Sequence, residues 1–213
     1  MHLELFGSPI SPYVRAVRVA AAEKRIKYEL LPIGPDDLRA PGYTRRHPFR
    51  KLPSLAIGED RIYETSAILR FIDEHFESGR ALQPADPVGR AHSEQWLSAA
   101  NSYLYDAAFT GLYFATQLAP GFGITVNQEQ VAASIDATRR HLAIVGEALA
   151  AGELRPASDL QLGGILTASI LVLLRDFEDG RSLLSEVPIV NAWLRDVSQL
   201  RSFQSTQADV PGA

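Results

Sequence analysis

A serine–proline pair at residues 11–12 has the chemistry of a helix start that could also bind an anion. Proline suits the first helical position, where its missing N–H costs nothing, so Ser11 is predicted to be the N-cap. Arg15 and Arg18 follow early in the same predicted helix, where cations oppose the helix macrodipole. The two cations make sense at this position if an anion binds at the helix start. A thiolate is a suitable anion, because a helix N-terminus lowers the pKa of a thiol. The chain has no cysteine, so the thiol would arrive on a ligand, and Ser11 either only caps the helix or also contacts that ligand.

The segment RKLPSL at residues 50–55 places a proline just before an expected strand, a position allowed only at the start or edge of a sheet. A cis Leu52–Pro53 bond would turn the backbone of Leu52 outward, where it could hydrogen-bond an extended ligand. Only about 5% of X–Pro bonds in folded proteins are cis, so the residues alone leave the isomer open.

Glu64 directly precedes two hydroxyl residues, Thr65 and Ser66, either of which can cap a helix. A helix N-terminus with a free hydroxyl binds a carboxylate, and an adjacent carboxylate binds an ammonium group. This segment is therefore suited to recognise both charged ends of an amino acid.

Aromatic residues concentrate in NSYLYDAAFTGLYF at residues 101–114, on a predicted helix. Most of them should belong to a hydrophobic core, and the rest could line an apolar pocket facing a smaller domain, because domain interfaces favour pockets. The residues chosen for such a pocket from their predicted placement are Ile10, Tyr13, Tyr105, Phe109 and Tyr113.

The elements that position these residues alternate between strand and helix over residues 1–78. Their order is β-α-β-α-β-β-α, which predicts one sheet with helices packed against it. The strands are expected in LELF, KYELLPI, LPSLAIG and RIYE, and the helices at about 12–24, within 36–46, and from 65 to near 78.

Residues 79–87 read as a linker, and the remainder, 88–213, reads as an all-helical domain. The predicted fold is therefore a small α/β domain over residues 1–78 followed by a larger all-α domain. Helices are expected at about 88–118, 127–151, 158–175 and 188–200, with a shorter one near 178–185.

Composition narrows the function classes. A net charge of −4 with mixed signs favours neither nucleic acid nor an anionic membrane as partner. The apolar run at 162–174 is too short to span a bilayer, and no leader precedes MHLELF, so we expect a cytoplasmic protein. The absence of cysteine excludes disulfides and a protein thiol, and the five histidines lack the spacing of metal ligands, so no metal is expected.

Taken in order, five segments resemble the cytosolic-type glutathione S-transferase family over essentially the whole chain, with a serine-type and bacterial-like pattern. The resemblance implies a thioredoxin-like N-terminal domain, an all-α C-terminal domain, glutathione as co-substrate and a homodimer. The segments are SPYVRAVRVAAAEK, HPFRKLPSL, ETSAILRFI, LQPADPVGRAHSEQWL and VPIVNAWLRDV.

The resemblance also implies roles for single residues. Ser11 matches the residue that activates the glutathione thiol, and Pro53 matches the family's cis proline. Glu64 and Thr65 match the motif that holds the γ-glutamyl group. The glutathione-binding residues implied in this way are Arg50, Lys51, Leu52, Pro53, Glu64 and Thr65, with Lys51 or Arg50 as the partner of the glycine carboxylate.

The chain departs from the family pattern at a few positions. Arg50 stands where glycine is common and His47 where asparagine is common. In the segment PASD, Pro156 replaces a helix-capping residue while Asp159 is kept. Phe49 is either an interface residue of the implied homodimer or a loop aromatic packed in its own chain.

The implied chemistry is attack by the glutathione thiolate on an apolar electrophile. Lowering a thiol pKa by about two units needs roughly 2.7 kcal/mol, and one charge-assisted hydrogen bond from Ser11 supplies about 1.5–3 kcal/mol. Tyr13 is a rival donor or pocket wall. The alternatives are a non-catalytic ligand carrier or interaction module, and a glutathione-dependent isomerase, dehalogenase or ether-cleaving enzyme.

Overall fold

The computed structural model describes residues 2–208, and the chain divides into two compact units. Among the described residues, unit 1 comprises 2–82 together with 201–208, and unit 2 comprises 83–200. This division differs from the expected boundary at the C-terminal end, because the last described residues belong to unit 1 rather than to the helical domain.

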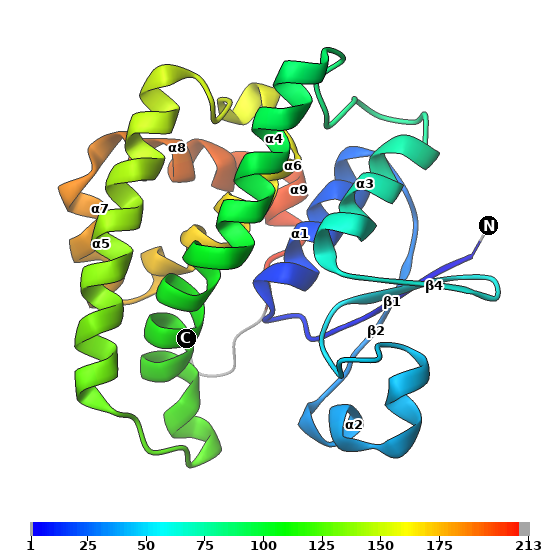
Figure 1. Ribbon diagram of the computed structural model, residues 1–213, viewed down its shortest axis with the longest axis horizontal. Coiled ribbons are helices and arrows are strands. Elements are labelled where there is room, and N and C mark those ends of the chain that lie inside the picture. The colour runs from blue at the N-terminus through cyan, green and yellow to red at the C-terminus, as the bar shows by residue number, and fades with distance from the viewer. Residues whose placement is uncertain (1, 209–213) are drawn as a thin grey trace. The chain divides into compact units, whose positions relative to one another are not determined.

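Unit 1 contains a four-stranded sheet in the order β2-β1-β3-β4 (Figure 1). The first two strands pair in parallel, and the remaining neighbours pair antiparallel. The β-α-β-α-β-β-α order predicted from the sequence is confirmed. The bounds are β1 Leu3–Phe6, α1 Pro12–Glu23, β2 Glu29–Leu31, α2 Pro35–Arg39, β3 Ser54–Ile57, β4 Asp60–Tyr63 and α3 Thr65–His75.

Both faces of this sheet are covered. Successive residues of a strand point to opposite faces, so Leu5 and Leu55, which pair across β1 and β3, lie on one face. Phe6 and Ala56 lie on the other face, in a buried cluster with Ile33 and Tyr43. Helices α1 and α3 pack against each other. The Tyr43 ring lies in the buried cluster with Phe6 and Ala56, and so it anchors its loop to the sheet.

Unit 2 is helical throughout its regular structure. The helix expected at 88–118 is one continuous run, α-helical over α4, Pro87–Ala99, and π-helical over Ala100–Leu118. The other helices are α5 Gln128–Ala151, α6 Leu162–Leu171, α7 Glu178–Glu186 and α8 Pro188–Gln199, with 3-10 turns at Ala119–Phe122, Ala157–Asp159 and Val172–Asp176. Every residue of α6 is buried, so this helix forms the centre of the unit.

The segment PASD does not cap a helix in this unit. Helix α6 begins at Leu162, with Gln161 as its N-cap, rather than near residue 158 as predicted. Asp159 instead accepts a hydrogen bond from Nε of Arg155 at 2.8 Å across the preceding 3-10 turn. The segment therefore shapes the loop before α6.

A short helix, α9 at Arg201–Gln204, brings the C-terminal segment onto α1 within unit 1. Arg15 donates to the Phe203 carbonyl at 3.1 Å and lies over the Phe203 ring, 5.3 Å from its centroid. Arg18 donates to the Thr206 carbonyl at 3.1 Å. The sequence predicts an anionic ligand for Arg15 and Arg18, whereas in the structure both bind carbonyl oxygens near the end of α9, where cations are favourable.

Within the described part of the chain, no helix combines the length and the apolar character needed to cross a membrane.

Candidate functional site

Ser11 is the N-cap of α1, as predicted. Its backbone is extended, with φ −74° and ψ 126°, and Pro12 occupies the first helical position. The Ser11 Oγ accepts a hydrogen bond from the Val14 N–H at 3.4 Å, and its own N–H donates to the Ser8 carbonyl at 3.0 Å. Since the side-chain oxygen acts as the acceptor in the capping bond, the hydroxyl proton can still be donated to a ligand at the helix start.

The Leu52–Pro53 peptide bond is cis, which confirms the isomer implied by the family resemblance. Among residues 2–208, the N–H and C=O of Leu52 form no hydrogen bond, so both groups can serve a ligand. The carbonyl of the preceding residue, Lys51, accepts a hydrogen bond from the buried Tyr43 hydroxyl at 3.0 Å. The core of unit 1 thus holds the loop from which a ligand would be contacted.

Arg50 occupies a left-handed backbone conformation with φ +53°. Glycine adopts this conformation without the steric cost of a Cβ atom, which explains physically why glycine would suit the position. The Arg50 guanidinium donates to the carbonyls of Arg39 at 2.8 Å and Leu38 at 3.4 Å, at the end of α2. By contrast, the exposed Lys51 amine makes no hydrogen bond or ion pair with the rest of the described chain.

The start of α3 differs from the prediction. Its N-cap is Glu64, not Thr65 or Ser66, and no side chain caps the helix. Glu64 has φ +70°, an uncommon conformation for a residue with a side chain, and its carboxylate is 58% exposed. Uncapped N–H groups at a helix start attract an anion, so this end of α3 has the donors for a carboxylate beside an accessible carboxylate for a cation.

His47, a departure from the family pattern in the sequence, lies beside this helix start. Its side chain is 2% exposed, and its Nε2 lies 4.0 Å from the Glu64 Oε1. Burial lowers the pKa of His47, the Glu64 carboxylate opposes that shift, and Lys51 adds to it. The signal that could have identified it was the imidazole at a position where an amide is common.

The three aromatic residues proposed for a pocket on the helix at 101–114 form one row. The Tyr105 and Phe109 ring centroids are 5.0 Å apart, and those of Phe109 and Tyr113 are 6.0 Å apart. Burial raises the pKa of Tyr105 to about 12, with Asp106 adding to the shift, so its hydroxyl is protonated at neutral pH and can donate a hydrogen bond. The other two candidates, Ile10 and Tyr13, are half-buried residues of unit 1, flanking Ser11.

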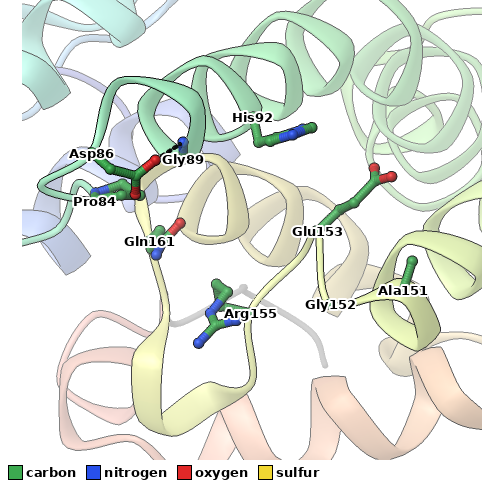
Figure 2. Close-up of a pocket in the computed structure, with 9 residues that line it drawn as sticks. All are labelled: Pro84, Asp86, Gly89, His92, Ala151, Gly152, Glu153, Arg155 and Gln161. Atoms are coloured by element: carbon green, nitrogen blue, oxygen red, sulfur yellow. Dashed lines mark hydrogen bonds between the residues drawn. The ribbon is translucent and has the colours of Figure 1, made fainter.

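A pocket of about 440 Å³ lies within unit 2, and Figure 2 shows its lining residues. The lining is rich in charged and polar groups, and it includes none of the five residues predicted for the electrophile. Two of those groups are already engaged, because Asp86 accepts from the Gly89 N–H at 2.7 Å and Arg155 donates to Asp159. The residues are Pro84, Asp86, Gly89, His92, Ala151, Gly152, Glu153, Arg155 and Gln161.

His2, Glu4 and Glu29 come together at the edge of the sheet in unit 1, a grouping that sequence spacing did not reveal. Parallel pairing places Glu4 beside Glu29, and the His2 Nε2 lies 3.3 Å from the Glu29 Oε2 and 3.9 Å from the Glu4 Oε1. Each side chain offers one atom that could bind a metal ion, although all three are at least partly exposed and equally suited to ion pairing.

Comparison with known proteins finds similarity to glutathione S-transferases. Residues 5–84 match the model of the glutathione S-transferase N-terminal domain. Glutathione S-transferase 3 of Zea mays is 29% identical to this chain over 98% of this chain and 95% of its own length. Among solved structures, glutathione S-transferase III in apo form has a TM-score of 0.85 and 26% identity, covering 99% of this chain and 98% of its own.

A further structure, glutathione S-transferase I from mais in complex with an atrazine glutathione conjugate, has a TM-score of 0.81 and 21% identity over 96% of both chains, and so shows a shared fold. The domain match and the relatives along nearly the whole length agree with each other. The chain is therefore similar to glutathione S-transferases along nearly its whole length, and it has a thioredoxin-like N-terminal domain and a helical C-terminal domain. The Zea mays relative is a plant protein, and the bacterial-like pattern stays a prediction.

Proposed function

We propose that this chain is a serine-type glutathione S-transferase, in which the Ser11 hydroxyl stabilises the glutathione thiolate for attack on an apolar electrophile. The observation that carries the proposal is the capping geometry of Ser11. Its oxygen accepts from the Val14 N–H, which directs the remaining hydroxyl proton away from the helix backbone.

The required energy is within reach of this arrangement. A free thiol with a pKa near 8.5 needs roughly 2.7 kcal/mol of preference for the anion to reach a pKa about two units lower. A charge-assisted hydrogen bond from Ser11 contributes about 1.5–3 kcal/mol, and the start of α1 adds up to about 1 kcal/mol. Arg15 and Arg18 are bound to the C-terminal segment, so this sum does not include them.

The glutathione backbone is proposed to bind beside the cis proline. The unpartnered N–H and C=O of Leu52 can hydrogen-bond the backbone of the cysteinyl part of the tripeptide. An extended peptide binds a sheet edge through main-chain hydrogen bonds of the same kind. Thr65, at the start of α3, suits the γ-glutamyl carboxylate, and Glu64 suits the adjacent ammonium group. Lys51 is the proposed partner of the glycine carboxylate, with Arg50 and Pro53 shaping the loop.

The electrophile is proposed to contact the aromatic row Tyr105, Phe109 and Tyr113. The burial of these rings supports an aromatic or otherwise apolar compound. The pocket of unit 2 has no aromatic ring of this row in its lining and carries the polar side chains of Asp86, Glu153 and Arg155 instead.

The decisive experiment titrates the thiolate absorbance of bound glutathione in the wild type, in Ser11→Ala and in the control Ser8→Ala. We expect a depressed thiol pKa in the wild type and in Ser8→Ala, and a return toward the solution value with loss of most turnover in Ser11→Ala. Glutathione affinity should be retained, because Ser11 contacts only the sulfur. Unchanged turnover in Ser11→Ala would refute the assignment, and a loss in Tyr13→Phe instead would identify Tyr13 as the donor.

The same titration separates the alternative functions. Glutathione bound with an unshifted thiol in the wild type would indicate a ligand carrier or interaction module. A shifted thiol without activity on an aryl halide, but with activity on an isomerisable, halogenated alkyl or ether substrate, would indicate a glutathione-dependent isomerase, dehalogenase or ether-cleaving enzyme.

We also propose a cytoplasmic homodimer with Phe49 in the interface. Phe49 is 69% exposed although its side chain is hydrophobic, and its ring forms T-shaped pairs with the His47 and Tyr63 rings, each with a centroid distance of 6.3 Å. Sedimentation velocity on the wild type would show a monomer mass if this assembly is wrong.

A further inference from the structure

His47 occupies an enclosed position between the 3-10 turn Pro41–Arg45 and β3. Its backbone N–H donates to the Tyr43 carbonyl at 3.1 Å. The imidazole is covered by two aromatic rings, Tyr63 with a centroid distance of 5.0 Å and Phe49 with a centroid distance of 6.3 Å. A ring held on several sides in this way has a defined orientation, which is the first requirement for a side chain that positions another group.

The two ring nitrogens of His47 have unequal surroundings. Nε2 faces the Glu64 carboxylate, 4.0 Å from Oε1. Nδ1 is buried and has no hydrogen-bond partner among the described residues. A proton on Nδ1 would therefore be buried without an acceptor, whereas a proton on Nε2 points to a carboxylate, and this asymmetry favours the neutral tautomer protonated on Nε2.

The Glu64 carboxylate needs a hydrogen-bond donor such as the His47 Nε2 to fix its orientation. Its backbone is held at φ +70°, its side chain makes no capping bond, and its carboxylate is more than half exposed. The separation of 4.0 Å is longer than a hydrogen bond, and contacts of this kind in ligand-free sites often shorten when the ligand binds.

We infer that His47 is a positioning residue that aims the Glu64 carboxylate at the ammonium group of the γ-glutamyl end of the ligand. This inference rests on the proposed function and assigns a role to a residue in which this chain departs from the family pattern. As a neutral donor, His47 orients Glu64 without cancelling its charge. As an imidazolium, it would compete with the ligand's ammonium for the same carboxylate.

The groups that face His47 set the direction of the pH dependence. Burial and the nearby Lys51 lower the pKa of His47, and Glu64 raises it, while the Tyr63 and Phe49 rings cover the imidazole. The neutral form is therefore present at pH 7, and affinity for the γ-glutamyl end should fall as the pH drops through the lowered pKa of His47.

The test measures the affinity of two ligands by calorimetry for the wild type, for His47→Phe and for the exposed control His92→Asn. The ligands are S-methylglutathione, whose sulfur cannot ionise, and its analogue without the α-amino group. Phenylalanine keeps an aromatic ring against Tyr63 and removes the Nε2 donor. We expect His47→Phe to weaken S-methylglutathione about fivefold to tenfold and the deaminated analogue less than about twofold, with no change in His92→Asn.

An equal loss for both ligands in His47→Phe would overturn the inference, because a merely structural role would not distinguish them. Affinity of the wild type for S-methylglutathione should also decline between about pH 7 and 5 with a step that His47→Phe lacks. A step of the same size in both proteins would equally overturn it.

A second readout needs no ligand and separates this inference from the proposed function. By nitrogen-15 NMR of the histidine side chains, His47 should be protonated on Nε2 at pH 7, and Glu64→Gln should lower its pKa. Protonation on Nδ1, or a titration unaffected by Glu64→Gln, would refute the pairing itself. If the pairing is found but the wild type binds neither ligand, the proposed function fails and the role of His47 in recognition fails with it.

Discussion

The buried ion pair between Lys24 and Asp73 provides a quantitative test of how unit 1 is held together. Lys24 ends α1 and donates from Nζ to the Asp73 carbonyl at 3.1 Å and to its Oδ1 at 3.2 Å. Both side chains are almost fully buried, with 4% and 7% of their surface exposed. The same Oδ1 accepts the Leu82 N–H at 2.8 Å, so this carboxylate joins α1, α3 and the chain that leaves unit 1.

The proposed perturbation is Lys24→Met, which keeps much of the buried aliphatic stem and removes the charge. Removing one partner of a buried ion pair costs about 3–5 kcal/mol because the other charge is left uncompensated. Asp73 keeps its bond from Leu82, so we expect the lower end, about 3 kcal/mol. For a chain of this length that loss corresponds to a decrease in Tm of about 6–12 °C.

Differential scanning calorimetry, supported by urea unfolding, measures this change. The matched control is Arg39→Met, which removes an ion pair with Asp36 whose side chains are 77% and 100% exposed, and which should leave the Tm unaltered. A decrease in Tm below about 2 °C in Lys24→Met would contradict the prediction, because it would mean that water solvates the remaining Asp73 charge. An equal decrease in Arg39→Met would mean that the effect does not depend on burial.

Two further predictions concern backbone geometry and the loop before β3. Gly79→Ala should destabilise the protein by at least about 2 kcal/mol, because φ is +76° and a Cβ would lie 2.2 Å from the Glu23 carbonyl oxygen. Gly58→Ala, at φ +59° with open space around it, should cost only about 1 kcal/mol, and equal urea midpoints for the two variants would contradict the steric argument. Tyr43→Phe removes the bond to the Lys51 carbonyl and should raise the KM for glutathione with kcat unchanged; steady-state kinetics that show an unaltered KM would exclude this role for Tyr43.

Local features of this chain could be predicted from its sequence because they depend on neighbouring residues. Ser11 and Pro12 form an N-cap and first helical position through their own side chains, and Gly152 ends α5 in the left-handed conformation that glycine favours. Hydrophobic periodicity similarly indicated the order of elements in unit 1 and most helices of unit 2, with bounds displaced by a few residues.

The start of α3 shows where local reasoning stops. Thr65 and Ser66 have strong capping propensity, but the N-cap is Glu64, because the chain leaves β4 with a positive φ at that residue. The β3–β4 register pairs Ser54 with Tyr63 and so brings the loop before β3 beside Glu64. That long-range pairing, rather than propensity, determines which carboxylate and which imidazole face each other.

The functional groups could be read from the residues: a capping serine, a proline before a strand, a carboxylate before a helix, and no thiol in the protein. The use of these groups depends on contacts between distant parts of the chain. The tertiary structure returned the C-terminal segment to α1, so that Arg15 and Arg18 bind the carbonyls of Phe203 and Thr206, which lie 188 residues away in the sequence. It also buried His47 beside Glu64. Such contacts arise when separate elements bury their apolar faces together, and that process leaves no periodic signal near either residue.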